Sequence, residues 1–285
     1  MRFARFGERG QERPAVIDAA GRLRDLSGVV PDLAGPVLGA LPRLDPEALP
    51  LVPGAPRLGP PVAGIGKIVG IGLNYSDHAA EVGAPAPAEP IVFLKAATAL
   101  NGAHDPVVLP RGAAKTDWEV ELGVVIGRRM KHVAVAEALR HVAGYAIVND
   151  ISERAWQLEG SGQWTKGKSC DSFAPMGPWL VTPDELGDVQ ALDLSTDVTG
   201  ERMQTGTTAR MIFGVAEILS YLSGVMTLEP GDVIATGTPP GVGAGRTPPR
   251  FLSAGDEMVL RVTGLGEQRS VVRAEEEQAG GCGKA

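Results

Sequence analysis

Residues 117–127, DWEVELGVVIG, constrain the fold more than any other stretch of this chain. In a β-strand successive side chains point to opposite faces, so Asp117, Glu119 and Glu121 share one face while apolar side chains fill the other. Carboxylates at every second position lie about 6.6–6.8 Å apart, and no Lys or Arg separates them to offset their repulsion. An edge strand with a solvated acidic face is the simplest alternative. The strand continues as VVIG, however, which is typical of burial on both faces and favours carboxylates inside a sheet.

Glycine and proline limit the rest of the fold. The 285-residue chain holds 38 Gly and 23 Pro, which favours turns and short strands over long helices. Helical patterns are few, and they do not alternate regularly with the strand patterns, so we predict a strand-rich α+β fold. The predicted strands outside 117–127 include 67–75, 90–96, 146–152, 232–239 and 256–266, and the predicted helices are 76–83, 133–145 and a segment within 207–225.

The chain divides by composition into unequal parts. Residues 53–64, PGAPRLGPPVAG, form a Pro/Gly-rich connection, so we predict a small N-terminal α/β domain over 1–60. A catalytic domain over 61–274 follows, and residues 275–285 are predicted to be a disordered tail.

Charge and cysteine content argue against several kinds of partner and location. The net charge of -7 argues against nucleic acid or an anionic membrane as partner. The two cysteines, Cys170 and Cys282, suggest no disulfide framework, which fits a reducing compartment. No segment reaches the roughly 18 apolar residues of a membrane helix, and the N-terminus lacks the apolar part of a signal peptide. We therefore expect a cytoplasmic protein.

A nucleotide-binding motif occurs by letters at Gly162–Ser169, GQWTKGKS, which satisfies G-x-x-x-x-G-K-[ST]. That motif requires a preceding strand and a helix that starts at its Lys-Ser. Here a polar, glycine-rich stretch precedes it, and Pro175, Gly177 and Pro178 prevent a sustained helix after it. A non-catalytic nucleotide-binding protein therefore remains only as an unfavoured alternative.

A second acidic position suggests a metal site. Asp150 ends the apolar run AIVND. With Glu119 and Glu121 it forms an all-oxygen set of three carboxylates, which suits Mg²⁺ and also Mn²⁺ or Ca²⁺. Such a site keeps a negative charge near -1 with a divalent ion, so a neighbouring cation such as Lys168 would help to bind an anionic substrate.

His78 and Glu81 form the most suggestive polar pair. In the sequence HAAE they are three residues apart, so they share one face of a helical turn. A carboxylate that holds an imidazole selects its tautomer and raises its basicity, as a general base requires. The alternative is an exposed helical pair of little consequence.

Six blocks of the chain together resemble the fumarylacetoacetate hydrolase superfamily, from about Lys67 to Val272. In chain order they are GLNYSDHAAE, PIVFLKAATALNG, DWEVELGVVIG, GYAIVNDISER, KGKSCDSFAPMGPWL and PGDVIATGTPPGVG. The resemblance implies a mixed β-sandwich roll, a small preceding domain and a homodimer.

The resemblance also implies roles for individual residues. Glu119, Glu121 and Asp150 match the metal ligands of the family, and His78 with Glu81 matches its water-activating dyad. Lys168 matches its active-site lysine. Gln157 matches a glutamine that contacts substrate, and Thr238 matches a threonine near the substrate carboxylate. Arg154, Lys95 and Asp117 lie in similar blocks without an assigned role.

The implied reaction is metal-dependent hydrolysis of a carbon–carbon bond in a 2,4-diketo acid, or acylpyruvate. Residues 153–173 are similar to the branch that acts on rhamnonate- or fuconate-derived acids, so we expect a 2,4-diketo-3-deoxy sugar acid to yield pyruvate and a small hydroxy acid. The same scaffold supports three alternatives: an oxaloacetate decarboxylase, a 2-hydroxyhepta-2,4-diene-1,7-dioate isomerase and a ureidoglycolate lyase.

Overall fold

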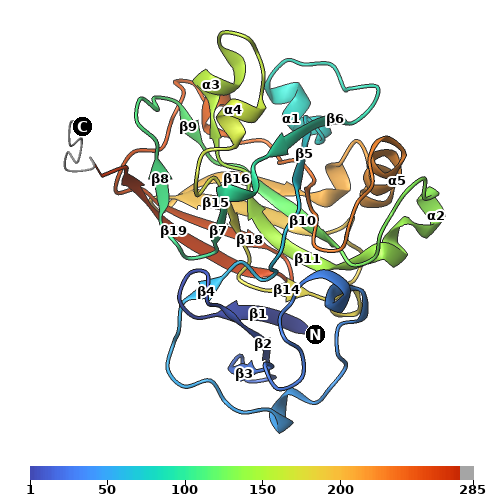
Figure 1. The fold of residues 1–285 in the computed structure, drawn as a ribbon. Helices are drawn as coiled ribbons and strands as arrows, with labels where there is room; N and C mark the ends of the chain where they lie inside the picture. The colour runs from blue at the N-terminus through green and yellow to red at the C-terminus, as the bar shows by residue number, and fades with distance from the viewer. Residues whose placement is uncertain (277–285) are drawn as a thin grey trace, which may run out of the picture.

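A 12-stranded mixed sheet dominates the computed structural model, which describes residues 1–276. Its main path runs β3-β2-β1-β14-β11-β10-β17-β5-β6, and β4, β7 and β13 pair beside that path (Figure 1). The strands of this sheet are β1 Arg2–Phe6, β2 Arg13–Ile17, β3 Leu23–Asp25, β4 Leu58–Gly59, β5 Ile68–Gly72, β6 Ile91–Lys95, β7 Leu100–Gly102, β10 Val120–Ile126, β11 Val142–Asn149, β13 Ala174–Met176, β14 Leu180–Val181 and β17 Val233–Ala235.

A five-stranded sheet packs against the centre of the large one. Its order is β16-β15-β18-β19-β8, and β15, β18 and β19 contact β10 and β11. A third, two-stranded sheet joins β9 to β12. These strands are β8 Val107–Leu109, β9 Thr116–Asp117, β12 Ser152–Glu153, β15 Asp193–Val198, β16 Glu201–Thr207, β18 Glu257–Val262 and β19 Gly266–Ala274. The predicted strand-rich α+β architecture is confirmed.

The helices are short and lie outside the sheets. Helices α1, α3 and α4 gather at the end of the molecule opposite the N-terminal strands, whereas α2 and α5 lie together at one side (Figure 1). No helix within residues 1–276 is long and apolar enough to cross a lipid bilayer. The α-helices are α1 Ser76–Glu81, α2 Val135–Ala138, α3 Arg154–Leu158, α4 Thr165–Lys168 and α5 Val215–Val225, and the 3-10 helices are Gly35–Ala40, Pro46–Ala48, Ala97–Ala99, Leu139–His141, Pro183–Glu185, Thr208–Arg210 and Gly243–Gly245.

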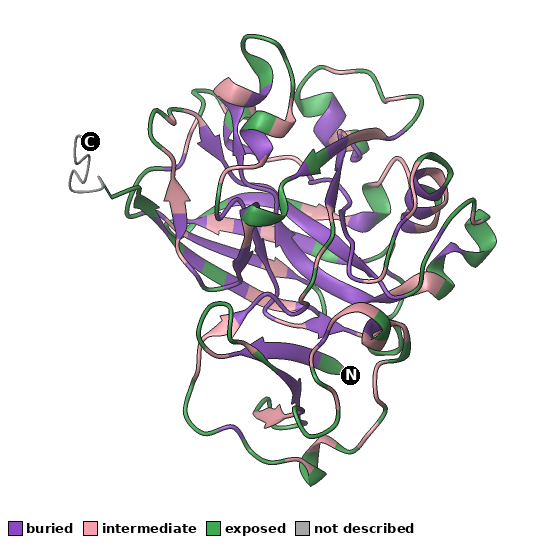
Figure 2. Cartoon of the chain, viewed as in Figure 1, coloured by how far each residue is buried: buried purple, intermediate pink, exposed green. Residues whose placement is uncertain are grey.

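Strand β10 is the centre of the core. All seven of its residues are buried, and it lies between β11 and β17 in the large sheet (Figure 2). The alternative of an exposed edge strand is therefore wrong for this segment. The antiparallel register pairs Val120 with Asn149, so the residues just outside each strand end, Glu119 and Asp150, become neighbours.

The predicted helix over 133–145 is much shorter than its pattern suggests. Only α2 and one 3-10 turn form, and Val142 already begins β11. Gly144, predicted to end the helix, instead pairs with Val125 in the middle of the sheet. A side chain there would come within 2.5 Å of the Val181 carbonyl, so glycine is needed for the close approach of β14. Pairing with β10 has overridden the helical periodicity.

The N-terminal lobe, residues 1–60, extends the large sheet. Strand β1 pairs with β2 and β4 within the lobe and with β14 of the main body. The boundary near residue 60 stays a prediction. The tail predicted over 275–285 falls mostly on 277–285, outside the residues that the structure describes.

Candidate active site

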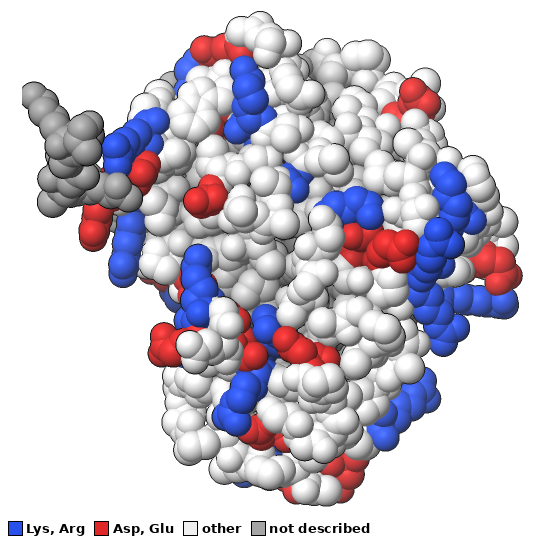
Figure 3. Space-filling model, in the orientation of Figure 1, with Lys and Arg blue, Asp and Glu red and all other residues white. Residues whose placement is uncertain are grey.

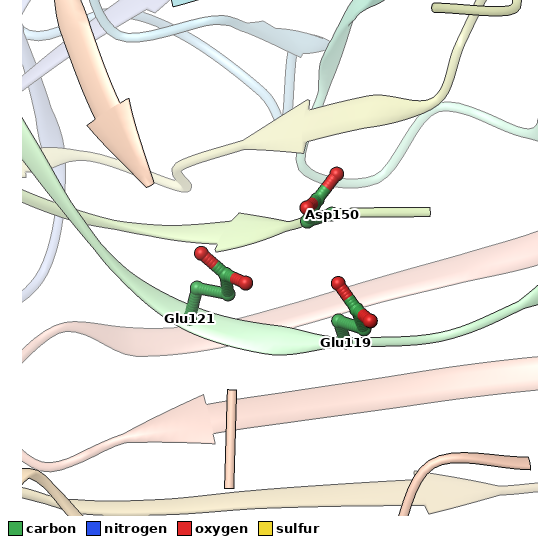
Figure 4. Close-up of side chains that lie close together, drawn as sticks. All are labelled: Glu119, Glu121 and Asp150. Atoms are coloured by element: carbon green, nitrogen blue, oxygen red, sulfur yellow. The ribbon is translucent and has the colours of Figure 1, made fainter. Parts of the chain in front are cut away.

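Three buried carboxylates converge where β10 begins and β11 ends. Glu119 immediately precedes β10, Glu121 is the second residue of that strand, and Asp150 follows β11. Figure 4 shows the side chains of Glu119 and Glu121 rising from one strand toward Asp150. Each offers an oxygen within 4.8 Å of the other two. The predicted metal-ligand set is thus brought together in one place.

Backbone hydrogen bonds fix this arrangement. The Asp150 N–H donates to the Glu119 carbonyl (2.9 Å), and the Asn149 side-chain oxygen accepts the Glu119 N–H (3.2 Å). Glu119 and Glu121 share a face because their side chains are two residues apart in an extended chain. Strand pairing then decides which third carboxylate joins them.

Three buried cations surround the carboxylates. Lys168 Nζ donates to Glu119 Oε2 (2.7 Å) and to Asp150 Oδ2 (2.6 Å). Lys95 Nζ donates to Asp150 Oδ1 (2.5 Å), and Arg154 Nη2 donates to Glu119 Oε1 (2.7 Å). Lys168 was predicted to lie beside the carboxylates. Lys95 and Arg154 had no assigned role, and the structure makes them direct partners of two of the three predicted ligands.

Glu121 differs from its two neighbours. Within residues 1–276 its carboxylate accepts only the Gly237 N–H (2.8 Å). Burial, together with the charges of Asp150 and Glu119, raises the pKa of Glu121 well above its usual range. Burial also acts to raise the pKa of Glu119, but the two cations paired with Glu119 outweigh it and leave that pKa lowered. A cluster with one uncompensated carboxylate among hard oxygen donors fits a divalent cation such as Mg²⁺.

The His78–Glu81 dyad lies on α1 and is buried at its histidine end. His78 Nδ1 lies 2.8 Å from Glu81 Oε2, and the Gly241 N–H donates to Glu81 Oε1 (2.8 Å). Burial would raise the pKa of Glu81, but these two hydrogen bonds outweigh it, so the pKa is lowered and the group is a carboxylate. A carboxylate acceptor places a proton on Nδ1 and leaves Nε2 as the basic nitrogen.

Asp117 supports the loop that holds the dyad. Its carboxylate accepts the backbone N–H groups of Gly243 (2.6 Å) and Ala244 (3.0 Å) and also the Arg154 Nε–H (2.9 Å). The loop after β17 is therefore tied both to Arg154 in the carboxylate cluster and, through Gly241, to Glu81. The sequence indicated only that Asp117 belongs to the acidic block.

Gln157 and Thr238 line the same cavity. The Gln157 side-chain oxygen accepts from Arg154 Nη1 (3.0 Å). The Thr238 hydroxyl donates to the Val120 carbonyl and accepts from Gln204 Nε2, each at 2.8 Å. Gln204, which sequence reasoning missed, holds Thr238 from a strand of the other sheet, and no local pattern marks it.

One cavity of about 240 Å³ joins these groups. Charged and polar side chains line one part of it and apolar side chains line the rest. The lining residues are Ile71, Gly72, Leu73, His78, Val82, Phe93, Glu119, Glu121, Asp150, Arg154, Gln157, Leu158, Trp164, Lys168, Thr238, Val242 and Ala244. All predicted site residues except Glu81 line it, and Glu81 contacts it through His78.

The segment Gly162–Ser169 is not built as a phosphate loop. Its short helix, α4, ends at Lys168, whereas a phosphate loop requires a helix that begins there. The Lys168 ammonium is buried against two carboxylates, as described above. The nucleotide-binding alternative therefore lacks its structural context.

The fold and the site define an enzyme of the fumarylacetoacetate hydrolase class. A sequence model described as fumarylacetoacetate (FAA) hydrolase C-terminal matches residues 67–273, and the chain belongs to this family. A relative from Sphingomonas sp. (strain SKA58), named 2,4-didehydro-3-deoxy-L-rhamnonate hydrolase, is 57% identical over 273 residues, which cover 95% of this chain and 96% of the relative.

Two solved structures place the fold in the same family. Fumarylacetoacetate hydrolase from the psychrophile Exiguobacterium antarcticum matches with a TM-score of 0.87 at 35% identity, over 96% of this chain and 100% of that one. A 2-hydroxyhepta-2,4-diene-1,7-dioate isomerase from Mycobacterium marinum matches with a TM-score of 0.76 at 33% identity, over 97% and 100%. The predicted family and its sandwich fold are confirmed.

Proposed function

We propose that this enzyme hydrolyses a carbon–carbon bond of a 2,4-diketo acid and requires a divalent cation. The observation that carries the proposal is the shared cavity, which is lined by the three-carboxylate cluster and also by His78 of the dyad. The carboxylates suit a metal and an anionic substrate, and the dyad suits activation of water.

Glu119, Glu121 and Asp150 would hold the cation, and Mg²⁺ suits their hard oxygens, with Mn²⁺ or Ca²⁺ as alternatives. When bound, the cation would supply Lewis-acid stabilisation of negative charge on the substrate oxygens. It would also compensate Glu121, the carboxylate that lacks a cationic partner in the protein itself.

The dyad would activate the attacking water. Nε2 of His78 accepts a proton from water, and Glu81 stabilises the resulting imidazolium through Nδ1. The hydroxide adds to the C4 carbonyl, and the C3–C4 bond breaks with its electron pair on C3, as a pyruvate enolate. The imidazolium returns a proton to C3. Water is thereby consumed, and the products are pyruvate and the carboxylic acid of the acyl part.

Lys168 would stabilise the enolate by charge. Its ammonium group is buried in the cavity wall beside Glu119 and Asp150, and these carboxylates outweigh burial and raise its pKa. The lysine therefore stays protonated at neutral pH, and because its side chain is buried its charge would act strongly on a developing oxyanion. Gln157 and Thr238 would orient the substrate.

The substrate we propose is a 2,4-diketo-3-deoxy sugar acid, cleaved to pyruvate and a small hydroxy acid. Support comes from the name of the 57%-identical Sphingomonas relative, whose coverage of the chain includes the whole site. The direct test is an assay for hydrolysis of acetylpyruvate and of the sugar-acid diketone. Cleavage is monitored as loss of the diketone absorbance, once with Mg²⁺ and once with EDTA. Absence of cleavage under every metal condition would refute the proposal.

A diene isomerase is the second candidate, because the Mycobacterium marinum neighbour carries that name. Oxaloacetate decarboxylation is a third possibility on the same scaffold, and neither reaction needs attack by water. His78→Ala should lower acylpyruvate hydrolysis by roughly 10²–10⁴-fold while Mn²⁺ binding measured by calorimetry persists. Hydrolysis that survives this substitution would contradict the assigned base.

A further inference from the structure

Two chemically different groups of side chains line the cavity. One group contains the carboxylates and cations of the proposed chemistry. The other, which we call the apolar end, contains Trp164, Phe93, Val82 and Leu158. Val82 and Leu158 are 45% and 55% exposed although they line the cavity, and we call this pair the apolar rim. Trp164 lines the same cavity and is half-buried.

Two glycines of β5 make room for the aromatic rings of Phe93 and Trp164. Gly70 and Gly72 are two residues apart, so they open the same face of the strand. A Cβ on Gly70 would lie 2.1 Å from Cζ of Phe93, and a Cβ on Gly72 would lie 2.4 Å from Cζ3 of Trp164. Neither position tolerates a side chain while the rings stay where they are. The local sequence VGIG thus leaves a flat surface on β5 against which the Phe93 and Trp164 rings pack.

The rings link the apolar end to the charged end. The ring centroids of Phe93 and Trp164 are 5.6 Å apart in a tilted pair, and Lys168 Nζ lies 4.8 Å from the Phe93 centroid. The indole is therefore held at a set place relative to the proposed enolate-binding lysine. An acyl part that leaves Lys168 along the Phe93 ring would meet Trp164 next.

Charge is distributed unevenly between the two ends. Among the cavity-lining residues within 1–276, the cations are Arg154 and Lys168, and both are paired with the carboxylates Asp117, Glu119 and Asp150. Neither is available to a second carboxylate at the Trp164 end. An anion buried there would lose hydration without gaining a partner, which is costly.

From this arrangement we infer that Trp164, with Leu158 and Val82, is the recognition site for the acyl end of the substrate. The inference rests on the proposed function and narrows it. The site selects acylpyruvates whose acyl end is short and apolar, such as a terminal methyl group. It disfavours acyl ends that finish in a primary hydroxyl or in a second carboxylate.

Two acylpyruvates of matched size test this selection. 2-Hydroxybutyrylpyruvate and glyceroylpyruvate both carry the hydroxyl group next to C4 that a sugar-acid diketone carries, and they differ only by a methyl or a hydroxyl group at the end of the acyl part. We expect kcat/KM of the wild type to favour 2-hydroxybutyrylpyruvate by roughly 10–100-fold. Trp164→Ala should bring this ratio to within about threefold of one, and Trp164→Phe should keep most of it. A ratio near one in the wild type, or an unchanged ratio in Trp164→Ala, overturns the inference.

The ratio separates recognition from structural damage. Trp164 lies four residues before Lys168, so its removal can disturb the lysine and slow every substrate. Such a disturbance lowers both kcat/KM values by a common factor, which cancels in the ratio.

A substitution that adds a charge tests the same site in the opposite direction. Leu158→Lys places a cation at the rim and should raise kcat/KM for succinylpyruvate relative to propionylpyruvate by about threefold to fivefold, the size of a partly exposed ion pair. Leu139→Lys is the matched control, because Leu139 is 45% exposed and does not line the cavity. An equal response of the two variants contradicts the inference.

A binding measurement separates this inference from the proposed reaction. If the wild type cleaves no acylpyruvate, the proposed function fails, but the recognition site can still be judged. α-Ketocaproate has an apolar tail and no C4 carbonyl, so it cannot be hydrolysed. Trp164→Ala should weaken its binding about tenfold in calorimetry and leave the binding of pyruvate within twofold. Equal weakening of both ligands overturns the recognition site.

Discussion

Two clusters of charged side chains use similar residues for different purposes. One is the carboxylate cluster of the cavity. The other joins the N-terminal lobe to the main body, where Figure 3 shows positive and negative side chains gathered on the visible face. We call the second the interlobe cluster. It contains the side chains of Arg5, Arg9, Glu12, Asp32, Arg57 and Asp105.

The interlobe cluster is balanced in charge and geometry. The Arg57 guanidinium donates a bidentate pair of hydrogen bonds to the Asp105 carboxylate, at 2.8 and 2.7 Å, and a further hydrogen bond to Glu12 at 2.8 Å. Arg5 makes the same bidentate contact with Asp32, at 2.7 and 3.0 Å. Three arginines thus meet three carboxylates. Burial would raise the pKa of Asp105, but the hydrogen bond and charge of Arg57 outweigh it, and the pKa is lowered.

The cavity cluster is unbalanced. Lys95, Arg154 and Lys168 face four carboxylates once Asp117 is included, and Glu121 has no cationic partner within the described chain. A balanced cluster needs nothing further and acts as structure. A buried cluster that is short of one positive charge favours either a proton on Glu121, as the raised pKa of this group reflects, or the bound cation that we propose.

The largest expected effect comes from removing the unpaired charge. Glu121→Gln keeps the shape of the side chain and an oxygen for the Gly237 N–H, but it removes the carboxylate. We expect kcat/KM for an acylpyruvate to fall on the order of 10³-fold, because several kcal/mol of metal-dependent stabilisation is lost. The thermal shift caused by Mn²⁺ should disappear as well.

The same substitution should behave differently in the absence of metal. With EDTA present, Glu121→Gln should unfold at a temperature equal to or higher than the wild type, because it relieves repulsion from Asp150 and Glu119. A clear loss of metal-free stability would mean that Glu121 stabilises the fold, as the interlobe cluster does. It would contradict the assignment of the two clusters to different roles.

A smaller effect is expected when the balanced cluster is broken. Asp105→Asn leaves Arg57 without its two-pronged partner, so the free energy of unfolding should fall by about 2 kcal/mol, measured by urea denaturation. The Mn²⁺ thermal shift should stay as in the wild type. A changed metal response would show that the interlobe cluster and the cavity are energetically coupled.

The sequence predicts the cavity carboxylates because their signal is local. Glu119 and Glu121 alternate within one apolar strand, and Asp150 ends another, so each can be singled out from its own neighbours. The family resemblance implied that the three belong to one ligand set, whereas the pairing of β10 with β11 that brings them together was not predicted. The interlobe cluster has no such signal. In the sequence Arg57 and Asp105 look like ordinary surface charges, and they meet only because the N-terminal lobe packs against the main body.

Long-range packing explains the other omissions. The helix predicted over 133–145 gave way to β11, because residues from Val142 onward gain more from pairing with β10 than from a helical turn. The packing of the Phe93 and Trp164 rings on the two glycines of β5 could not be predicted from the sequence either. Nothing near Gly72 indicates that Trp164, more than ninety residues later, must fit against it.

The smallest expected effect is the acid response of the interlobe cluster. The pKa of Asp105 in the folded protein lies below its ordinary value of 3.8. A lowered pKa means that the unfolded chain binds the proton first as pH falls. The stabilisation from Asp105 is therefore complete well above pH 3.8 and is lost as pH falls from about 5 toward the folded-state pKa. Urea denaturation at several pH values between about 6 and 3 should show a shallower loss of stability in Asp105→Asn than in the wild type. Parallel curves would show that Arg57 does not hold this carboxylate in solution, and the contrast with the cavity would then rest on Glu121 alone.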